Sequence, residues 1–317
     1  MRCADGLLRS VAACMVFAGA SLALSAARSA DLPLKAPAMS GCVQAVDGVN
    51  GKLAGLGGSF SDHSLGGAIG SLSMPLGCEW GFQFDATAAS FDGRFLGAGA
   101  GHLFWRDPAK ALFGVYGSYT YWDQVGGVRI GHVGPEAEWY IGRWTLQGVA
   151  GVEFGNNASG TVGSVLTTYD VSTRFFDQVN LAYYLTDDFK AYVGHRYLGG
   201  KNALALGGEY GMPLGHGIMG SLFAEGRIGE DDYHGIWAGV RFYFGQHDKT
   251  LIRRHREDDP TDWDAGVDGT GNTGTTTPLA PPQNCCPGAG ANNLILRPGT
   301  QLAELVVVAA SCLCPST

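Results

Sequence analysis

The residues that could do chemistry in this sequence are charged side chains that recur at every second position of short apolar segments. Because side chains alternate across a pleated strand, this spacing places the charges on one common face. Solvated charges along a pore would bias the passage of ions or solutes, whereas charges paired across strands would hold a filled interior together. The candidates for this lumen-facing set are Glu79, Asp85, Glu136, Glu138, Glu153, Lys190, Arg196, Glu209, Glu225, Arg227 and Arg241.

The sequence contains no pattern that indicates a catalytic site. A membrane-embedded hydrolase needs a nucleophile, a base within hydrogen-bond reach and a group that orients the base. His63 precedes Ser64 and His102 precedes Leu103, but neither spacing presents a histidine and a serine on one strand face beside an acidic partner. We therefore expect no enzyme activity.

Metal and cofactor sites are equally unsupported. His132 and Glu136 share a strand face, yet residues four strand positions apart are too distant to chelate one ion without further ligands. The run from Gly97 to Gly101 lacks the following helix pattern and the spacing of a dinucleotide fingerprint, so a small-residue strand explains it better. We expect no metal and no cofactor.

The apolar–polar alternation predicts the elements that position the charged face. From Ile236 to Phe244 every second residue is apolar, while Arg241 lies on the opposite face. A membrane strand takes roughly 9 to 11 residues and bacterial single-chain barrels use even strand numbers, so about twelve strands are expected and ten is the alternative. Pro135 weakens the sixth segment, because proline removes a ladder donor. The predicted strands are Val49 to Phe60, Leu65 to Met74, Glu79 to Phe91, Phe95 to Trp105, Ala111 to Trp122, Val128 to Tyr140, Trp144 to Phe154, Arg174 to Leu185, Phe189 to Tyr197, Ala203 to Met212, Ile218 to Ile228 and Ile236 to Phe244.

The odd or even position of each strand in the chain also orients the predicted barrel. With both of its ends in the periplasm, the connections after even-numbered strands are periplasmic turns, and they are short and rich in turn residues. The longest connection, Gly155 to Thr173, then falls on the outside, as expected of outer-membrane barrels. An interfacial aromatic girdle explains the tryptophans that flank the periplasmic turns. In the alternative, a soluble lipocalin-like barrel of about eight strands, the apolar face would point inward.

Composition separates this chain from helical membrane proteins. It is 45% hydrophobic with only 16% charged residues and 50 glycines, and after the N-terminal segment no stretch is long and apolar enough for a membrane helix. Glycine weakens a helix by roughly 1 kcal/mol per site, whereas closed barrels tolerate it at bends and close approaches. The formal net charge of -8 gives no indication of a nucleic-acid partner.

The amino terminus has the pattern of a cleaved secretory signal over residues 1–30. Arg2 and Arg9 precede an apolar run from Val11 to Leu24, and small residues follow it. This run is too short to span a bilayer comfortably, although a membrane anchor is the alternative. Residues 31–45 would then form a periplasmic segment ahead of a barrel over residues 46–244.

Two cysteines flank the predicted barrel entrance. Cys42 precedes the first strand and Cys78 adjoins the exit of the second, so both should lie at the periplasmic rim. Because the periplasm is oxidising, we expect a disulfide between them, with two unpaired thiols as the alternative.

Residues 245–317 differ abruptly from the barrel in composition. Lys249 to Arg256 is basic, Glu257 to Asp259 is acidic, and Gly266 to Gln283 is rich in Gly, Thr and Pro. This pattern is typical of a solvated, flexible linker. The apolar stretch Leu305 to Ala310 is too small for a core of its own. We expect a disordered periplasmic tail, with binding to a periplasmic partner as the alternative.

Two motifs carry a resemblance to a known group of proteins. The predicted mature start, Ala30 to Pro37, and the closing segment, Val240 to Phe244, resemble small porin-like outer-membrane proteins of alpha-proteobacteria. The resemblance implies contact with outer-membrane lipid and lipopolysaccharide, insertion by the barrel-assembly machinery with Phe244 as the assembly signal, and passive diffusion of small solutes. This chain departs from the group by continuing well past Phe244. An autotransporter translocator would also have about twelve strands, but almost no passenger fits between the signal and Val46.

The sequence as a whole predicts an all-β, single-domain, transmembrane antiparallel up-and-down barrel in the outer membrane of a Gram-negative bacterium. Its expected function is that of a passive porin-like channel for small hydrophilic solutes. The alternative is a non-conducting structural or surface-exposed outer-membrane protein.

Overall fold

The computed structural model describes residues 42–162, 165–231, 233–263 and 274–278. The chain divides into the units Met1–Cys42 and Val43–Thr317, and every helix and strand below belongs to the second unit. The predicted secretory signal, residues 31–41 and the tail residues 279–317 lie outside the described residues. None of the described helices is long and apolar enough to cross a membrane.

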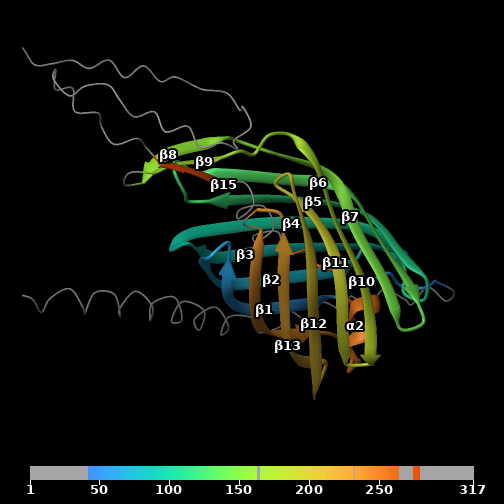
Figure 1. The fold of residues 1–317 in the computed structure, drawn as a ribbon. Helices are drawn as coiled ribbons and strands as arrows, with labels where there is room; N and C mark the ends of the chain where they lie inside the picture. Colours follow the sequence, from blue (N-terminus) through green and yellow to red (C-terminus); the bar gives the residue numbers. More distant parts are fainter. Residues whose placement is uncertain (1–41, 163–164, 232, 264–273, 279–317) are drawn as a thin grey trace, which may run out of the picture. The chain divides into compact units, whose positions relative to one another are not determined.

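Twelve antiparallel strands form a closed barrel in which the last strand pairs with the first (Figure 1). The closing ladder runs in register from Gly51 opposite Phe244 to Phe60 opposite Gly235. Closure pairs the backbone of every strand on both sides, which a strand needs when lipid surrounds it. The barrel strands are β1 (Asn50–Phe60), β2 (His63–Pro75), β3 (Trp80–Phe91), β4 (Arg94–Asp107), β5 (Ala111–Trp122), β6 (Val128–Ile141), β7 (Trp144–Gly155), β10 (Arg174–Thr186), β11 (Phe189–Leu198), β12 (Lys201–Gly215), β13 (Ile218–Gly229) and β14 (His234–Phe244).

The predicted twelve-strand barrel is confirmed, and the ten-strand alternative is wrong. Every predicted segment overlaps one barrel strand, and the ends differ by at most three residues. Pro135 is accommodated inside β6, because it pairs with Val115 of β5 while the β6–β7 ladder skips Gly134 and Pro135. The missing donor therefore interrupts only one of the two ladders.

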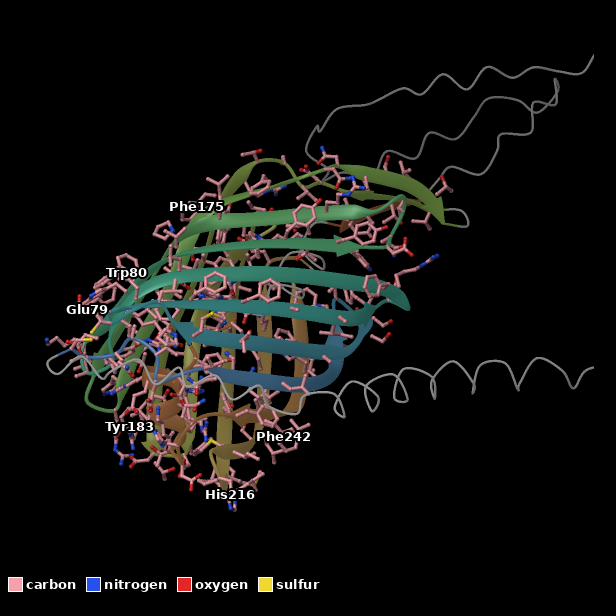
Figure 2. All side chains as sticks on the ribbon, turned by 180° about the vertical axis from the view of Figure 1, so that it is seen from behind. Glu79, Trp80, Phe175, Tyr183, His216 and Phe242 are labelled. Atoms are coloured by element: carbon pink, nitrogen blue, oxygen red, sulfur yellow. The ribbon has the colours of Figure 1, made fainter. Side chains whose placement is uncertain are left out.

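Alternate side chains of each strand point into and out of the barrel. On β14, Arg241 and Tyr243 are buried, whereas Val240, Phe242 and Phe244 are exposed. Large apolar side chains are exposed on all twelve barrel strands, and Figure 2 shows Phe242 among them on the outer surface. The exterior is therefore apolar, which suits contact with lipid and would be costly in water.

The two ends of the barrel are different. We call the end with the β2–β3, β4–β5, β6–β7, β10–β11 and β12–β13 turns the turn end, and the opposite end the loop end. β1 begins and β14 ends at the turn end, where helix α2 (Leu251–Glu257) also lies (Figure 1). The loop end carries the long β7–β10 connection. This connection is not a plain loop, because β8 (Ala158–Val162), β9 (Val165–Tyr169) and β15 (Gly274–Pro278) form a small sheet there in the order β15-β9-β8.

Candidate functional site in the barrel lumen

Most of the predicted lumen-facing charges are buried inside the barrel. Lys190 is slightly more open, with 13% of its side chain exposed. Buried charges are costly unless they are paired, so their contacts decide whether the lumen is a solvated pore or a filled interior. The buried members of the set are Asp85, Glu136, Glu138, Glu153, Arg196, Glu209, Glu225, Arg227 and Arg241.

Glu79 differs from this set. It precedes β3 at the turn end and is exposed, and its Oε2 accepts a hydrogen bond from Trp105 Nε1 at 3.3 Å. Figure 2 shows Glu79 next to Trp80 at the edge of the barrel. Its parity matches the lumen, but the strand begins one residue later, so Glu79 belongs to the rim and not to the lumen.

His102 bridges two carboxylates on the inner wall. Its Nε2 lies 2.9 Å from Asp85 Oδ2, and its Nδ1 lies 2.8 Å from Glu136 Oε2. Gln83 Nε2 donates to the same Asp85 oxygen at 3.2 Å. Both ring nitrogens are engaged by carboxylates, so neither is available as a base for a substrate. Among the described residues, no group of three or more His, Cys, Asp or Glu side chains is arranged to hold a metal ion.

Glu209 is the centre of a second cluster. Its carboxylate lies 3.2 Å from Arg241 Nη1, and it accepts hydrogen bonds from Tyr243 Oη and Ser221 Oγ, both at 2.7 Å. Lys190 Nζ is 3.9 Å away. Two cations and two hydroxyls thus surround one buried carboxylate, which is the kind of saturation that a buried charge needs.

Glu225 is the centre of a third cluster. Arg227 Nε lies 2.5 Å from its Oε1, Arg196 Nη2 lies 3.5 Å away, and the hydroxyl of Tyr192 donates to its other oxygen. The Arg227 guanidinium also stacks over the Trp237 ring, 4.9 Å from the ring centre. The predicted charges are therefore paired with each other, along β13 for Arg227 and across strands for Arg196, and they pack against large side chains, as the filled-lumen alternative expected.

The segment that follows β14 turns back into the barrel. We call residues 249–263 the plug. Their basic composition predicted a solvated linker, and this prediction is wrong for the plug, because α2 is fastened to three turns of the turn end. Ile252 N donates to Asp187 O at 2.9 Å, Arg254 Nη2 donates to Gly217 O at 2.8 Å, and Arg256 Nη2 donates to Gly142 O at 2.9 Å. Arg254 and Arg256 thus satisfy turn carbonyls, whereas Arg253 is exposed and pairs with Glu257.

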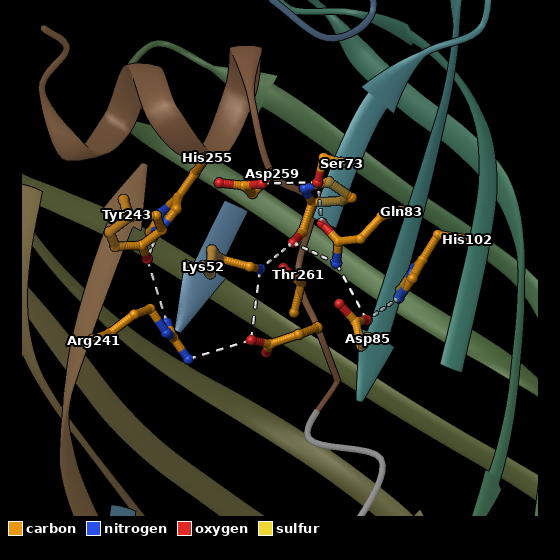
Figure 3. Close-up of polar contacts among 12 residues, drawn as sticks. Lys52, Ser73, Gln83, Asp85, His102, Arg241, Tyr243, His255, Asp259 and Thr261 are labelled. Carbon is orange, nitrogen blue, oxygen red and sulfur yellow. Dashed lines mark hydrogen bonds and ion pairs between the residues drawn. The ribbon is translucent and has the colours of Figure 1, made fainter. Parts of the chain in front are cut away.

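Beyond α2 the plug enters the lumen and binds the wall (Figure 3). Ser73 Oγ donates to Asp259 Oδ1 at 2.7 Å, and Lys52 Nζ donates to Pro260 O at 3.0 Å. All of these groups are buried. Lys52 of β1 and Ser73 of β2 thus have partners on the plug, although Ser73 Oγ also lies 2.8 Å from Gln83 Oε1 on the neighbouring strand β3.

The last described residues of the plug reach the charge clusters of the wall. Asp262 Oδ2 lies 3.6 Å from Lys52 Nζ and 3.4 Å from Arg241 Nη2. Trp263 Nε1 donates to Glu136 Oε2 at 3.3 Å, the oxygen that also contacts His102. Asp262 of the plug therefore pairs with two wall cations inside the polar half of the lumen.

Burial shifts the protonation of two plug residues in opposite directions. Burial raises the pKa of Asp258 to about 6, although a hydrogen bond from Lys249 opposes this shift. Burial and the neighbouring Lys190 hold the pKa of His255 well below its usual range, although Glu209 acts in the opposite direction. At neutral pH we therefore expect a neutral His255 in the docked plug. Its ring nitrogens lie 2.7 Å from Tyr184 Oη and 3.0 Å from Tyr243 Oη.

The half of the lumen nearer the loop end is filled by apolar side chains. Trp263 belongs to this cluster and is 4% exposed. The other members come from the loop-end parts of the barrel strands and from β9, and they include Phe60, Phe91, Leu96, Trp122, Val128, Tyr169, Phe176, Leu198, Tyr233 and Trp237. A remaining cavity of about 60 Å³ is lined by residues of the Glu209 and Glu225 clusters and by Thr261, Asp262 and Trp263 of the plug. This is room for a few water molecules, and it is not an open channel.

Two further predictions concern single residues. Cys42 and Cys78 are both disulfide-bonded, and Ala45 N donates to Cys78 O at 2.8 Å, which brings the chain beside Cys42 to Cys78. Their pairing with each other stays a prediction. Phe244 ends β14 with an exposed ring and pairs with Gly51 and Ile218, and its role as assembly signal also stays a prediction.

Sequence reasoning missed the partners that the plug supplies. His102 was also missed. It is the cross-strand partner of Gln83, which the strand alternation places on the same face as Asp85, so the alternation could have identified it. Asp259, Asp262 and Trp263 follow no strand pattern. Their one signal is that acidic residues and a tryptophan interrupt an otherwise basic and then Gly-rich tail.

Comparison with known proteins gives a fold-level likeness. No family model matches the chain, and no curated protein matches it. A structure from a study of in-meso crystallisation of membrane proteins is 12% identical, covers 72% of this chain and 99% of its own, and has a TM-score of 0.49. An outer-membrane channel from Pseudomonas putida F1 is 10% identical over 64% of this chain and 97% of its own, with a TM-score of 0.42. The translocator domain of the autotransporter NalP from Neisseria meningitidis is 12% identical over 74% of this chain and 97% of its own, with a TM-score of 0.38.

Proposed function

We propose that this protein is an outer-membrane β-barrel channel whose polar lumen is closed by its own plug. The observation that carries the proposal is the docking of residues 249–263 against charged wall residues, with Asp262 between Lys52 and Arg241. A barrel that only needed a filled interior could pair its wall charges with each other. Here Lys52 takes its ion-pair partner from the segment that follows the last strand, and Arg241 pairs with that segment as well as with Glu209 of the wall.

The location follows from the two faces of the wall. An apolar exterior around a polar, charged interior is the arrangement of bacterial outer-membrane barrels, in which short turns face the periplasm. On this basis the turn end and α2 face the periplasm, and lipid with lipopolysaccharide surrounds the barrel. The motifs at Ala30 to Pro37 and Val240 to Phe244 support the finer attribution to porin-like proteins of alpha-proteobacteria, inserted by the barrel-assembly machinery.

The solutes would be small and hydrophilic. With the plug withdrawn, Lys52, Lys190 and Glu138 would line the lumen beside the Arg241–Glu209 ion pair, and such a mixed lining favours hydrated polar solutes over apolar ones. In the docked state the same groups are paired or buried. The passive channel is therefore closed at rest.

The test is single-channel recording in planar bilayers. The refolded full chain without its signal should give few conductance steps, and so should a chain ending at Pro278, which keeps the plug. A chain ending at Gln246, which lacks the plug, should give frequent, stable ohmic steps. Heat-modifiable migration on gels checks that all three chains fold.

Two outcomes would contradict the proposal in different ways. Equal conductance of all three chains would show that the plug does not close the lumen. Persistent silence of the folded Gln246 chain would favour a non-conducting structural barrel, a function that the apolar cluster around Trp122 and Trp237 also supports.

A further inference from the structure

The tail makes contacts at both ends of the barrel. Helix α2 is bound to turns of the turn end through Asp187, Gly217 and Gly142. Strand β15 is paired with β9, which belongs to the β7–β10 connection at the loop end. Figure 1 shows α2 and β15 at opposite ends of the barrel strands. A single stretch of about thirty residues therefore has fixed positions at both openings.

The contacts between these two positions follow the inner wall in chain order. Asp259 meets Ser73, which is two residues from the turn-end terminus of β2. Trp263 meets Glu136, which lies five residues from the turn-end terminus of β6. Between these two contacts, Pro260 and Asp262 both meet Lys52, which is two residues from the turn-end terminus of β1. The advance therefore holds from Asp259 to Trp263 and not residue by residue. The plug is thus an advancing path and not a hairpin that returns to its own side.

The remaining distance is within reach of the chain. Glu136 is eight residues from Val128, the loop-end terminus of β6, and eight strand residues span roughly 27 Å. Residues 264–273, which connect Trp263 to β15, could span roughly 35 Å if extended. Trp263 and Tyr169, the β9 partner of Gly274, also belong to one buried apolar cluster.

The direction of β15 indicates where the chain goes next. β9 runs from Val165, at the tip of the β8–β9 hairpin, to Tyr169 near the barrel, where its ring packs against Trp122 at 5.0 Å between centres. Because β15 is antiparallel to β9, it begins at Gly274 opposite Tyr169 and ends at Pro278 opposite Val165. The tail therefore leaves the barrel and runs away from it at Pro278.

From this path we propose that the tail is threaded through the lumen and that the barrel presents the residues beyond Pro278 at its loop end. In the orientation given under the proposed function, this is the outer face of the cell. The prediction of a periplasmic tail is replaced by a surface-exposed segment, with the plug as the part that remains in the barrel. The threading itself rests only on contacts of the tail and does not depend on whether the unplugged lumen conducts.

The exposed segment is tested by tag accessibility on intact cells. One short epitope is inserted after Gly288 in the tail, one between β8 and β9 as a loop-end control, and one after Ala109 in the β4–β5 turn as a turn-end control. Antibody should stain the tail tag and the β8–β9 tag without permeabilisation, and the Ala109 tag only after the outer membrane is opened.

Each pattern of staining has one meaning. A tail tag that behaves like the Ala109 tag, while the β8–β9 tag is stained on intact cells, would overturn the threading. If the Ala109 tag alone is stained on intact cells, the proposed orientation is wrong, but a tail tag that still follows the β8–β9 tag upholds the threading. Mass spectrometry of the recovered protein verifies that the tail is intact.

A second measurement does not depend on the membrane. Thr276 and Thr167 are register partners of β15 and β9, so the pair Thr276→Cys and Thr167→Cys should form a disulfide that peptide mapping detects in the purified chain. The matched control keeps Thr276→Cys and places the second cysteine at Thr161 of β8, which does not pair with β15. Equal crosslinking of both pairs, or of neither, would contradict the β15–β9 contact.

Discussion

At the scale of single residues, the packing of the lumen depends on which partner each buried charge has. Asp262 has the cations Lys52 and Arg241 on opposite strands of the closing ladder. Glu136 receives both His102 and the indole of Trp263. If the plug withdrew without water replacing it, Lys52 would lose its ion-pair partner, whereas Arg241 would keep Glu209 and Glu136 would keep His102. Docking and hydration of the lumen are therefore linked.

His255 and Asp258 should make plug docking depend on pH with opposite signs. The docked His255 has a lowered pKa, so its share of the docking stability is present above its usual pKa and is lost as the pH falls. The docked Asp258 has a pKa raised to about 6, so its share is present at low pH and is lost as the pH rises through 6. Between pH 7.5 and pH 5 we therefore expect His255 to loosen the plug and Asp258 to tighten it.

Hydrogen exchange of residues 249–263, expressed as protection factors, measures this balance. In His255→Gln, protection should rise by about tenfold as the pH falls from 7.5 to 5, through Asp258 alone. In Asp258→Asn, protection should fall over the same range, through His255 alone. Identical pH profiles for the natural chain and His255→Gln would show that His255 does not control docking.

The cysteines permit a separate prediction. Because both are disulfide-bonded and Ala45 lies against Cys78, peptide mapping under non-reducing conditions should recover Cys42 and Cys78 in one linked pair. Cys42→Ser should then leave Cys78 free to react with a thiol reagent. Recovery of two free thiols, or of Cys78 linked to a tail cysteine, would contradict the pairing.

At the scale of the elements, the barrel depends on close approach where β6 and β7 lose ladder pairs. Beside Pro135, a Cβ on Gly134 would overlap the Ala150 carbonyl, and a Cβ on Gly151 would overlap the Val133 carbonyl. The strands fill the gap left by the proline by coming together at two glycines. This explains how a strand with an internal proline holds its place in a closed sheet.

Gly151→Ala should therefore destabilise the barrel by about 1–3 kcal/mol, because the strands must separate to admit the methyl group. The matched control is Gly55→Ala on β1, where an added Cβ meets nothing within 4 Å. Urea unfolding in lipid vesicles, followed by tryptophan fluorescence, compares the two. Equal midpoints for both variants would argue against a strained approach at the proline.

At the scale of the whole molecule, the outer and inner surfaces of one closed sheet have opposite chemistry. The exterior exposes apolar side chains on every barrel strand, and the interior holds ion pairs, the plug and an apolar cluster. Such a molecule can be stable only where lipid covers the outside, because the backbone is already fully paired and cannot rearrange to hide the exterior. The proposed membrane location follows from that constraint.

Charge on the outer face should therefore cost more at mid-height than at the rim. Val240 lies in the middle of β14, and Ile228 lies near the loop-end terminus of β13 with 73% of its surface exposed. Val240→Arg should lower the free energy of folding into vesicles by about 2–4 kcal/mol, and Ile228→Arg by about 0–1 kcal/mol. If both arginines are tolerated equally, the outer face does not meet hydrocarbon.

Local periodicity allowed the sequence alone to determine the barrel. An apolar residue at every second position defines a strand, its faces and its ends, and the segments from Val49 to Phe244 all obey that rule. Even the lumen charges could be read from the strand alternation, except at Glu79, because β3 begins one residue after the predicted segment does.

Only the tertiary structure decided what fills the barrel. The plug sequence shows no repeating apolar–polar pattern, because each of its contacts is made with a wall residue far away in the chain. Pro260 contacts Lys52, and Trp263 contacts Glu136. Composition made this segment resemble a solvated linker, because arginines and aspartates are polar in any context. Whether such charges face water or each other depends on the surface that surrounds them, and that surface exists only once the twelve strands have closed.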